Sequence, residues 1–144
     1  MSNSPARSLS GSAPSDLAKL LAERLGAAIL PGDTPLEGED LAEAAAFLLT
    51  TAAHREPERA AMAIESATNG RRRLRIALVN DDMPFLVDSI AATLTAQGVS
   101  IDRLVHPVIP VTRDASGDLT GLGGAEEGRK ESFVYIETPR VDAR

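Results

Sequence analysis

The residues best suited to chemistry in this chain lie close together, at positions 80–89. Two adjacent carboxylates, Asp81 and Asp82, follow an apolar run at 74–79, and Pro84 precedes a stretch with helical spacing. A helix that begins there directs unpaired N–H groups and the positive end of its dipole outward, which suits an acidic side chain or an anionic ligand. The candidate residues for effector binding or interdomain contact are Asn80, Asp81, Asp82, Met83, Pro84 and Phe85.

Two interpretations of the acidic pair are open. Asp81 or Asp82 can bind a metal ion or the ammonium group of a ligand. Alternatively, one of them caps the following helix by accepting backbone N–H bonds, which is worth about 0.5–2 kcal/mol. No other potential ligands cluster nearby in the sequence, so the pattern favours capping.

The two histidines do not indicate a catalytic site. His106 lies in a proline-bearing extended segment, and His54 lies in the last turn of a helix, where a cation complements the helix dipole. A triad can be drawn from His106, Asp82 and Ser89, but no nucleophile elbow accompanies them. We therefore predict no catalytic, cofactor-binding or metal-binding residues in this chain.

Composition narrows the class of protein. The chain has 144 residues, of which 43% are apolar, and a formal net charge of −6. This charge disfavours nucleic acids and anionic membranes as partners, because both attract basic surfaces. There is no cysteine, and neither a signal peptide nor a membrane-spanning run is evident. We expect a cytoplasmic protein with a disordered tail at residues 1–14.

The first half of the chain has helical patterning. Leucines and alanines recur at helical spacing over residues 15–29 and again over residues 39–54. Pro57 can occupy the first turn of a third short helix, which we predict over residues 57–67. Residues 15–70 are therefore predicted to form an N-terminal helical segment.

The second half changes to strands. Leu74, Ile76 and Leu78 alternate with their neighbours, which predicts a strand at 74–79 with these three on the buried face. A helix is predicted at 84–97, an extended segment at 99–112, a glycine-rich loop at 114–130 and a strand at 131–138. The extended segment contains Pro107 and Pro110, which places it at a sheet edge. The inward side of the helix is predicted to carry Val87, Ile90, Ala91 and Leu94.

This order predicts an α+β fold, with β-α-β-β elements after two or three N-terminal helices. Placing the last strand antiparallel between the first two gives a partial ferredoxin-like sheet over residues 71–144 that is incomplete at its C-terminal side. The strand at 74–79 then has an open edge, which is a pairing hazard. The N-terminal helices, another copy of the chain or the rest of a longer polypeptide could cover it, and we expect a homo-oligomer.

The corner also carries a family resemblance. An Asp-x-Pro corner that opens the first helix of a β-α-β-β unit resembles ACT domains. More narrowly, the corner resembles the first ACT-type domain of the large bacterial NAD-specific glutamate dehydrogenases, in the stretch VNDDMPFLVDSI at 79–90. Two further stretches stand where that family has similar ones, VHPV at 105–108 and ESFVYI at 131–136. The resemblance covers about residues 73–140 and is weaker upstream.

The resemblance implies a role in a larger enzyme. Members oxidatively deaminate L-glutamate to 2-oxoglutarate with NAD, and their NAD-binding and catalytic parts lie far downstream. It therefore implies a regulatory and oligomer-building region that has no cofactor and no dehydrogenase activity of its own. The expected partners are the remainder of the polypeptide or other copies of the chain.

One position departs from the ACT pattern. ACT domains that bind free amino acids usually carry glycine just after the corner proline, where the ligand approaches the backbone. Here the residue is Phe85, which favours a packing role for the corner over amino-acid binding. The alternative function is a free-standing ACT-type sensor that holds an amino-acid effector at this corner.

Overall fold

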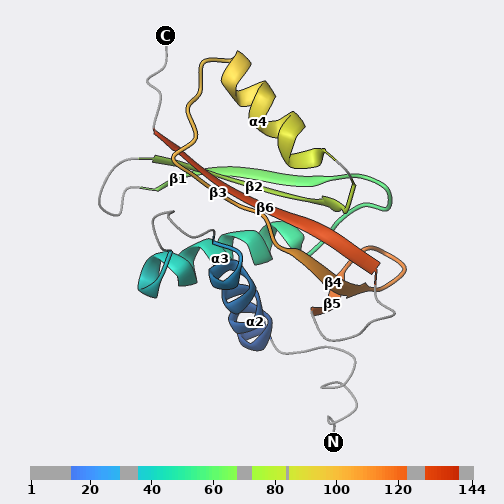
Figure 1. Ribbon diagram of the computed structural model, residues 1–144. Helices are drawn as coiled ribbons and strands as arrows, with labels where there is room; N and C mark the ends of the chain where they lie inside the picture. The colour runs from blue at the N-terminus through green and yellow to red at the C-terminus, as the bar shows by residue number, and fades with distance from the viewer. Residues whose placement is uncertain (1–13, 30–35, 68–72, 84, 123–128, 140–144) are drawn as a thin grey trace, which may run out of the picture.

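Helices cover both faces of one β-sheet (Figure 1). The computed structural model describes residues 14–29, 36–67, 73–83, 85–122 and 129–139. Two helices lie on one face and one helix on the other. The helices are α2 (Pro14–Ala27), α3 (Gly38–Ala52) and α4 (Leu86–Ala96). The strands are β1 (Ala61–Ala67), β2 (Arg73–Asp81), β3 (Arg103–Val105), β4 (Val108–Arg113), β5 (Leu119–Leu122) and β6 (Arg129–Pro139).

The last strand lies in the middle of the sheet. The order is β1-β2-β6-β4-β5, and every pairing is antiparallel. β3 and β4 lie end to end along the same side of β6, where β3 pairs with residues 135–137 and β4 with residues 129–132. The predicted α+β class and the placement of the last strand between the first two are confirmed.

The main core lies between the sheet and helices α2 and α3. Both faces of β6 are buried, and Phe133 and Tyr135 are its largest side chains on the α2/α3 side. The core members contributed by the helices and sheet include Leu21, Leu25, Leu48, Ala77, Val79, Val105, Ile109 and Val111. Because aromatic residues are few, aliphatic side chains fill most of this layer.

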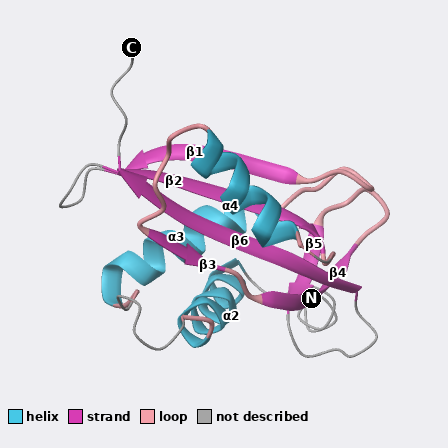
Figure 2. Ribbon diagram, turned by 45° about the horizontal axis from the view of Figure 1, so that its top comes forward, coloured by secondary structure: helices cyan, strands magenta, loops and turns pink. Residues whose placement is uncertain are grey.

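The opposite face is covered by α4, which crosses in front of the sheet in Figure 2. The predicted inward residues Val87, Ile90, Ala91 and Leu94 are half-buried, and no residue of α4 is fully buried. The helix itself is confirmed. Its packing on the sheet is looser than that of α2 and α3, which leaves part of this face open.

The prediction of a third helix at 57–67 is wrong, because residues 61–67 form β1. Methionine, alanine and glutamate are good helix formers, which made the segment look helical. In the structure Met62 pairs with Leu78 and Ile64 with Ile76, so the apolar residues of β1 extend the face formed by β2. Pairing with a strand that follows in the sequence outweighs the intrinsic helix propensity here.

The predicted open edge at residues 74–79 is also wrong. β1 pairs with β2 throughout residues 73–79, so the outer edge of the sheet on this side belongs to β1. Residues 114–130 are not all loop, since β5 forms within them and pairs with β4 from Val111 onward. The edge placement of the proline-bearing segment therefore holds for β3 and is wrong for the end of β4. Residues 123–128 lie outside the described part.

The buried face of β2 is the reverse of the predicted one. Ala77 and Val79 are fully buried against α2 and α3, and Arg75 joins them. Leu74, Ile76 and Leu78 face α4 and are only half-buried. Alternation alone cannot identify the deeper face of a strand that has helices on both sides. No helix in the described part of the chain is long and apolar enough to cross a membrane.

A strained turn links α3 to β1. The Arg59 N–H donates to the Glu56 carbonyl at 3.0 Å, which closes a turn with Pro57 and Glu58 at its centre. Glu58 has φ of 65°, so this is a type II turn with a non-glycine residue in the left-handed region. That conformation costs an L-residue roughly 1–2 kcal/mol.

Replacing Glu58 with glycine should stabilise the fold. We expect Glu58→Gly to raise the free energy of unfolding by about 1 kcal/mol, because glycine accepts positive φ without a steric cost. Urea denaturation measures this change. A control in the same turn is Glu56→Gly, which should lower the free energy of unfolding because it adds disorder to the unfolded chain and removes the contact with His54. Destabilisation by Glu58→Gly would contradict the proposed strain.

Candidate functional site at the strand–helix corner

The corner between β2 and α4 is held by side chains from other elements. Asn80 Oδ1 accepts a hydrogen bond from Arg55 Nη2 at 3.2 Å. Asp81 Oδ1 accepts from Arg55 Nη1 at 3.0 Å and from Arg129 Nη2 at 2.6 Å. The Arg55 guanidinium, with Arg129 adding to it, holds the pKa of the Asp81 carboxyl below its ordinary value. Asp81 is therefore an ion-pair partner and not a helix cap.

Asp82 forms its hydrogen bonds with residues of β6. Its Oδ1 accepts a hydrogen bond from the Ser132 hydroxyl at 3.1 Å, and its N–H donates to the Lys130 carbonyl at 3.3 Å. The residue that precedes the first turn of α4 is Phe85, and it makes no side-chain capping bond. The predicted capping role of the acidic pair is thus wrong: β6 and the arginines bind these carboxylates before the helix begins. Pro84 lies outside the described residues.

The negative charge of Asp82 interacts electrostatically with His106. Burial lowers the pKa of His106, while Asp82 opposes that shift. Among the described residues no hydrogen-bond partner reaches the buried Nε2 atom of His106. The Asp82 carboxylate accepts a hydrogen bond from the Ser132 hydroxyl and not from that of Ser89. The structure therefore does not form the triad drawn from His106, Asp82 and Ser89.

Phe85 adopts a backbone conformation that glycine would favour. Its φ is 66°, in the left-handed region, and its side chain is 75% exposed. Phe85 does not fill the corner, because it lies on the surface, and the packing role of the corner stays a prediction.

A buried carboxylate organises the region behind the corner. We call the group formed by Arg55, Asp81, Arg113, Arg129 and Glu131 the Glu131 cluster. Arg55 Nη1 donates to Glu131 Oε2 at 2.6 Å, and Arg113 Nη2 donates to Glu131 Oε1 at 3.0 Å. The side chain of Glu131 is fully buried, and those of Arg55 and Arg113 nearly so. These guanidinium groups offset the cost of burying the Glu131 carboxylate.

Backbone contacts place Arg55 in this cluster. Arg55 follows α3, and its N–H donates to the Gly117 carbonyl at 3.0 Å. Gly117 has φ of 97°, and a Cβ there would lie 2.0 Å from the Arg55 carbonyl oxygen, so only glycine allows this approach. His54 fixes the same junction, because its Nδ1 lies 2.7 Å from Asp118 Oδ1. The hydrogen bond with Asp118 raises the pKa of His54, and Glu56 adds to this effect.

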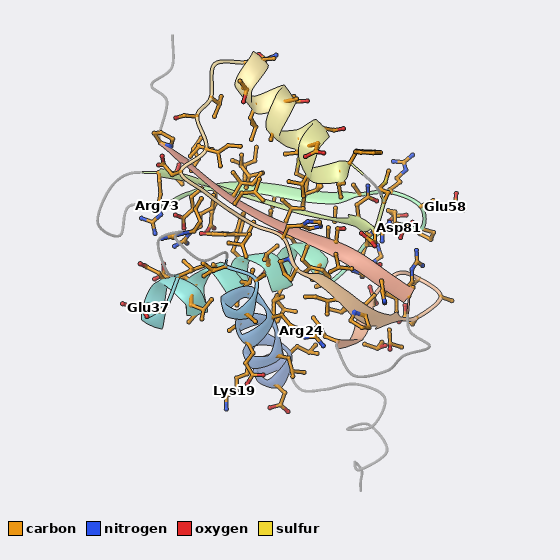
Figure 3. All side chains as sticks on the ribbon, in the orientation of Figure 1. Lys19, Arg24, Glu37, Glu58, Arg73 and Asp81 are labelled. Atoms are coloured by element: carbon orange, nitrogen blue, oxygen red, sulfur yellow. The ribbon has the colours of Figure 1, made fainter. Side chains whose placement is uncertain are left out.

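A small pocket of about 180 Å³ opens beside the Glu131 cluster. Arg55, Arg113 and Arg129 line it, together with the turn at Pro57 and Glu58 and the loop at Gly117. Figure 3 shows Asp81 and Glu58 near this end of the sheet, with Arg73 at the other end. The arginines suit a carboxylate ligand. No cluster among the described residues could hold a metal ion.

A second group of charges lies at the Arg73 end of the sheet. Glu137 accepts from the Tyr135 hydroxyl at 2.6 Å and from Arg103 Nη1 at 2.9 Å. Burial raises the pKa of Tyr135, and the bond to Glu137 adds to the effect. Arg75 binds Glu43 of α3 at 2.8 Å and so ties this end of the sheet to the helical layer.

Sequence reasoning missed Arg55, Arg113 and Glu131. They lie far apart in the sequence, and each looks like an ordinary surface charge. The one available signal was Glu131 itself, a charged residue at the start of a strand whose neighbours are apolar on both faces. The sequence did identify Asn80, Asp81 and Asp82, which the structure brings into one corner.

Comparison with known families matches residues 25–144 to the glutamate dehydrogenase ACT1 domain. The chain is 35% identical over 69 residues to the NAD-specific glutamate dehydrogenase of Halomonas elongata, and 36% identical over 69 residues to that of Pseudomonas aeruginosa. Each match covers 45% of this chain and only 4% of the relative. No solved structure matches the chain.

Removing the charge of Glu131 should strongly destabilise the fold. Glu131→Gln removes the carboxylate that binds the buried Arg113 and leaves Arg55 with Asp81 alone, so we expect the free energy of unfolding to fall by about 3 kcal/mol. Urea denaturation measures the loss. Glu23→Gln on the exposed side of α2 is the control and should change little. Equal stability of the two variants would show that the cluster does not hold the fold together.

The two histidines should titrate on opposite sides of 6.5, their ordinary pKa. NMR titration should give a midpoint above 6.5 for His54 and below it for His106. His54 then stabilises the fold at low pH, and its contribution is lost as the pH rises through its raised pKa. His106 acts in the opposite sense: its contribution is lost as the pH falls below 6.5 through its lowered pKa.

The substitution Asp118→Asn should change the pKa of His54 and leave that of His106 unchanged. This substitution should move the midpoint of His54 back toward 6.5, because it removes the main hydrogen-bonding carboxylate. The midpoint of His106 should not change. A shared midpoint for both histidines in the wild-type chain would contradict the described environments.

Proposed function

Because the chain belongs to the family of glutamate dehydrogenase ACT1 domains, we propose that it is the N-terminal regulatory and oligomer-building region of an NAD-specific glutamate dehydrogenase. In the complete enzyme, L-glutamate, NAD⁺ and water would give 2-oxoglutarate, ammonium, NADH and a proton. NAD and the reacting groups would belong to downstream domains of a cytoplasmic protein. The 144 residues would position or gate those domains.

The hydrogen bonds made by the corner side chains support this role most directly. Asn80 and Asp81 bind Arg55, and Asp82 binds Ser132. These contacts connect the end of α3 with β2 and β6. A displacement of the corner would therefore move both the sheet and the layer formed by α2 and α3. Charged groups that bind each other in this way serve to fix geometry, which suits a domain that contacts others.

A second candidate function is that of an ACT-type sensor, which would hold an amino-acid effector beside the Glu131 cluster. The observation in its favour is the pocket of about 180 Å³ beside Arg55, Arg113 and Arg129. Arg129 is half-exposed and can bind a carboxylate on its free side. Glu56, Glu58 and Asp114 at the pocket rim would repel a second acidic group, so a ligand with one carboxylate and an ammonium group fits the charges better.

Enzyme kinetics test the regulatory proposal. In the complete polypeptide that carries this region, Arg129→Gln should change the glutamate concentration for half-maximal rate by about fivefold, the lower range of coupling between sites. The control is Arg24→Gln on the exposed side of α2, which should leave the kinetics unchanged. NADH absorbance measures the rate. Unchanged kinetics in Arg129→Gln, or glutamate-dependent NADH formation by the 144 residues alone, would contradict the proposal.

Calorimetric titration distinguishes an amino-acid sensor from a positioning domain. Common amino acids should give saturable heat with the wild-type chain if the pocket binds an effector, and Arg129→Gln should abolish it. Arg24→Gln should retain the heat. A chain that gives no heat with any of them supports the positioning role and removes the sensor.

A further inference from the structure

Four large apolar side chains of β1 and of the corner before α4 are exposed. Phe85 is 75% exposed, Met62 63%, Ile64 59% and Met83 46%. Scattered apolar residues are normal on a protein surface, but these come from β1 and from the corner that begins α4. Met62 and Ile64 also line a groove whose other wall is α4.

The groove is open and almost wholly apolar. Its volume is about 330 Å³, and its apolar lining is formed by Met62, Ile64, Ile76, Leu78, Ile90 and Leu94. Its polar wall groups are the hydroxyls of Ser89 and Thr93, and none of the described residues that line it is charged. The groove exists because a single helix covers this face and none of its residues is fully buried.

Phe85 lies one helical turn before the groove wall. Its carbonyl accepts the N–H of Ser89 at 2.9 Å, and Ser89 lines the groove. The ring is held outside the protein by a left-handed backbone, a conformation that a bulky L-residue adopts only at an energetic cost. The isolated domain gains little from a strained residue whose side chain remains in water. A contact with another molecule would explain both features.

We propose that this face is the contact surface between two copies of the chain, with Phe85 of each copy seated in the groove of the other. A projecting aromatic residue one helical turn from an apolar groove lets the surface complement itself, as a two-fold contact requires. The inference deepens the proposed oligomer-building function and rests on it.

The distribution of charge favours a second copy. The chain carries a net charge of −6, so two copies repel each other over most of their surface. α4 carries one charged residue, Asp88, and the groove carries none. Two copies can therefore meet through this face without burying like charges, which their charged faces do not allow.

The area is sufficient for a weak dimer. Four exposed side chains of this size present on the order of 400 Å² per copy. With the half-buried groove lining, a symmetric contact reaches about 1,000 Å², the lower limit for a specific interface. A contact of this size should form and dissociate readily, so the dimer should depend on protein concentration.

Analytical ultracentrifugation of the 144-residue chain tests the surface. We expect a concentration-dependent monomer–dimer equilibrium that Phe85→Asn weakens about tenfold or more, as loss of an interface anchor does. Asparagine tolerates the left-handed backbone, so the corner should remain folded. Ile64→Glu places a charge in the groove and should weaken the dimer in the same way. Urea denaturation confirms that each variant is folded.

The control is Leu20→Glu, which changes an exposed leucine of α2 on the other side of the sheet and should leave the dimer intact. A dimer that survives both Phe85→Asn and Ile64→Glu would overturn the proposed surface and leave the regulatory role standing. A chain that stays monomeric at concentrations on the order of 100 µM would overturn it as well, since weak contacts form there. If that monomer binds an apolar dye and Ile64→Glu abolishes the binding, the groove belongs to another segment or ligand.

Discussion

The buried carboxylate of Glu131 is the constraint on which this structure depends. A charge removed from water must be compensated where it stands, and the nearest backbone groups of a β-strand are already paired. Arg55 and Arg113 supply the compensation at 2.6 and 3.0 Å. Arg55 comes from the end of the helical layer and Arg113 from β4, so neutralising one side chain fixes the relation between the helices, the central strand and its neighbour.

The ion pair between Glu131 and Arg55 also affects the geometry of the corner. Once Arg55 is fixed by Glu131, its remaining N–H groups reach Asn80 and Asp81 at the end of β2. The acidic pair is thereby drawn toward the sheet and away from the start of α4. Phe85 then begins the helix without a side-chain cap and in a left-handed conformation.

The two faces of the sheet serve different purposes. On the α2/α3 side, an apolar layer around Phe133 and Tyr135 lies between the Glu131 cluster and the charged group at Glu137. That side is closed and fixed in register by ion pairs. The α4 side holds one helix, half-buried aliphatic residues and a groove without charge. A domain with one closed face and one open apolar face is suited to connecting other parts of a protein.

Rules of strand connection, applied to the order of the elements, predicted the central position of β6. Local patterns in the sequence determined the strand–helix corner, the helices α2, α3 and α4, and the family. These features depend on residues that are neighbours along the chain, or on a contiguous motif such as that at 79–90. The tertiary structure alone decided that residues 61–67 form a strand, which face of β2 lies deeper, and that Arg55 and Arg113 meet at Glu131. In each of these cases the deciding energy comes from a partner distant in sequence, a paired strand or a buried opposite charge, and it exceeds the local preference that the sequence displays.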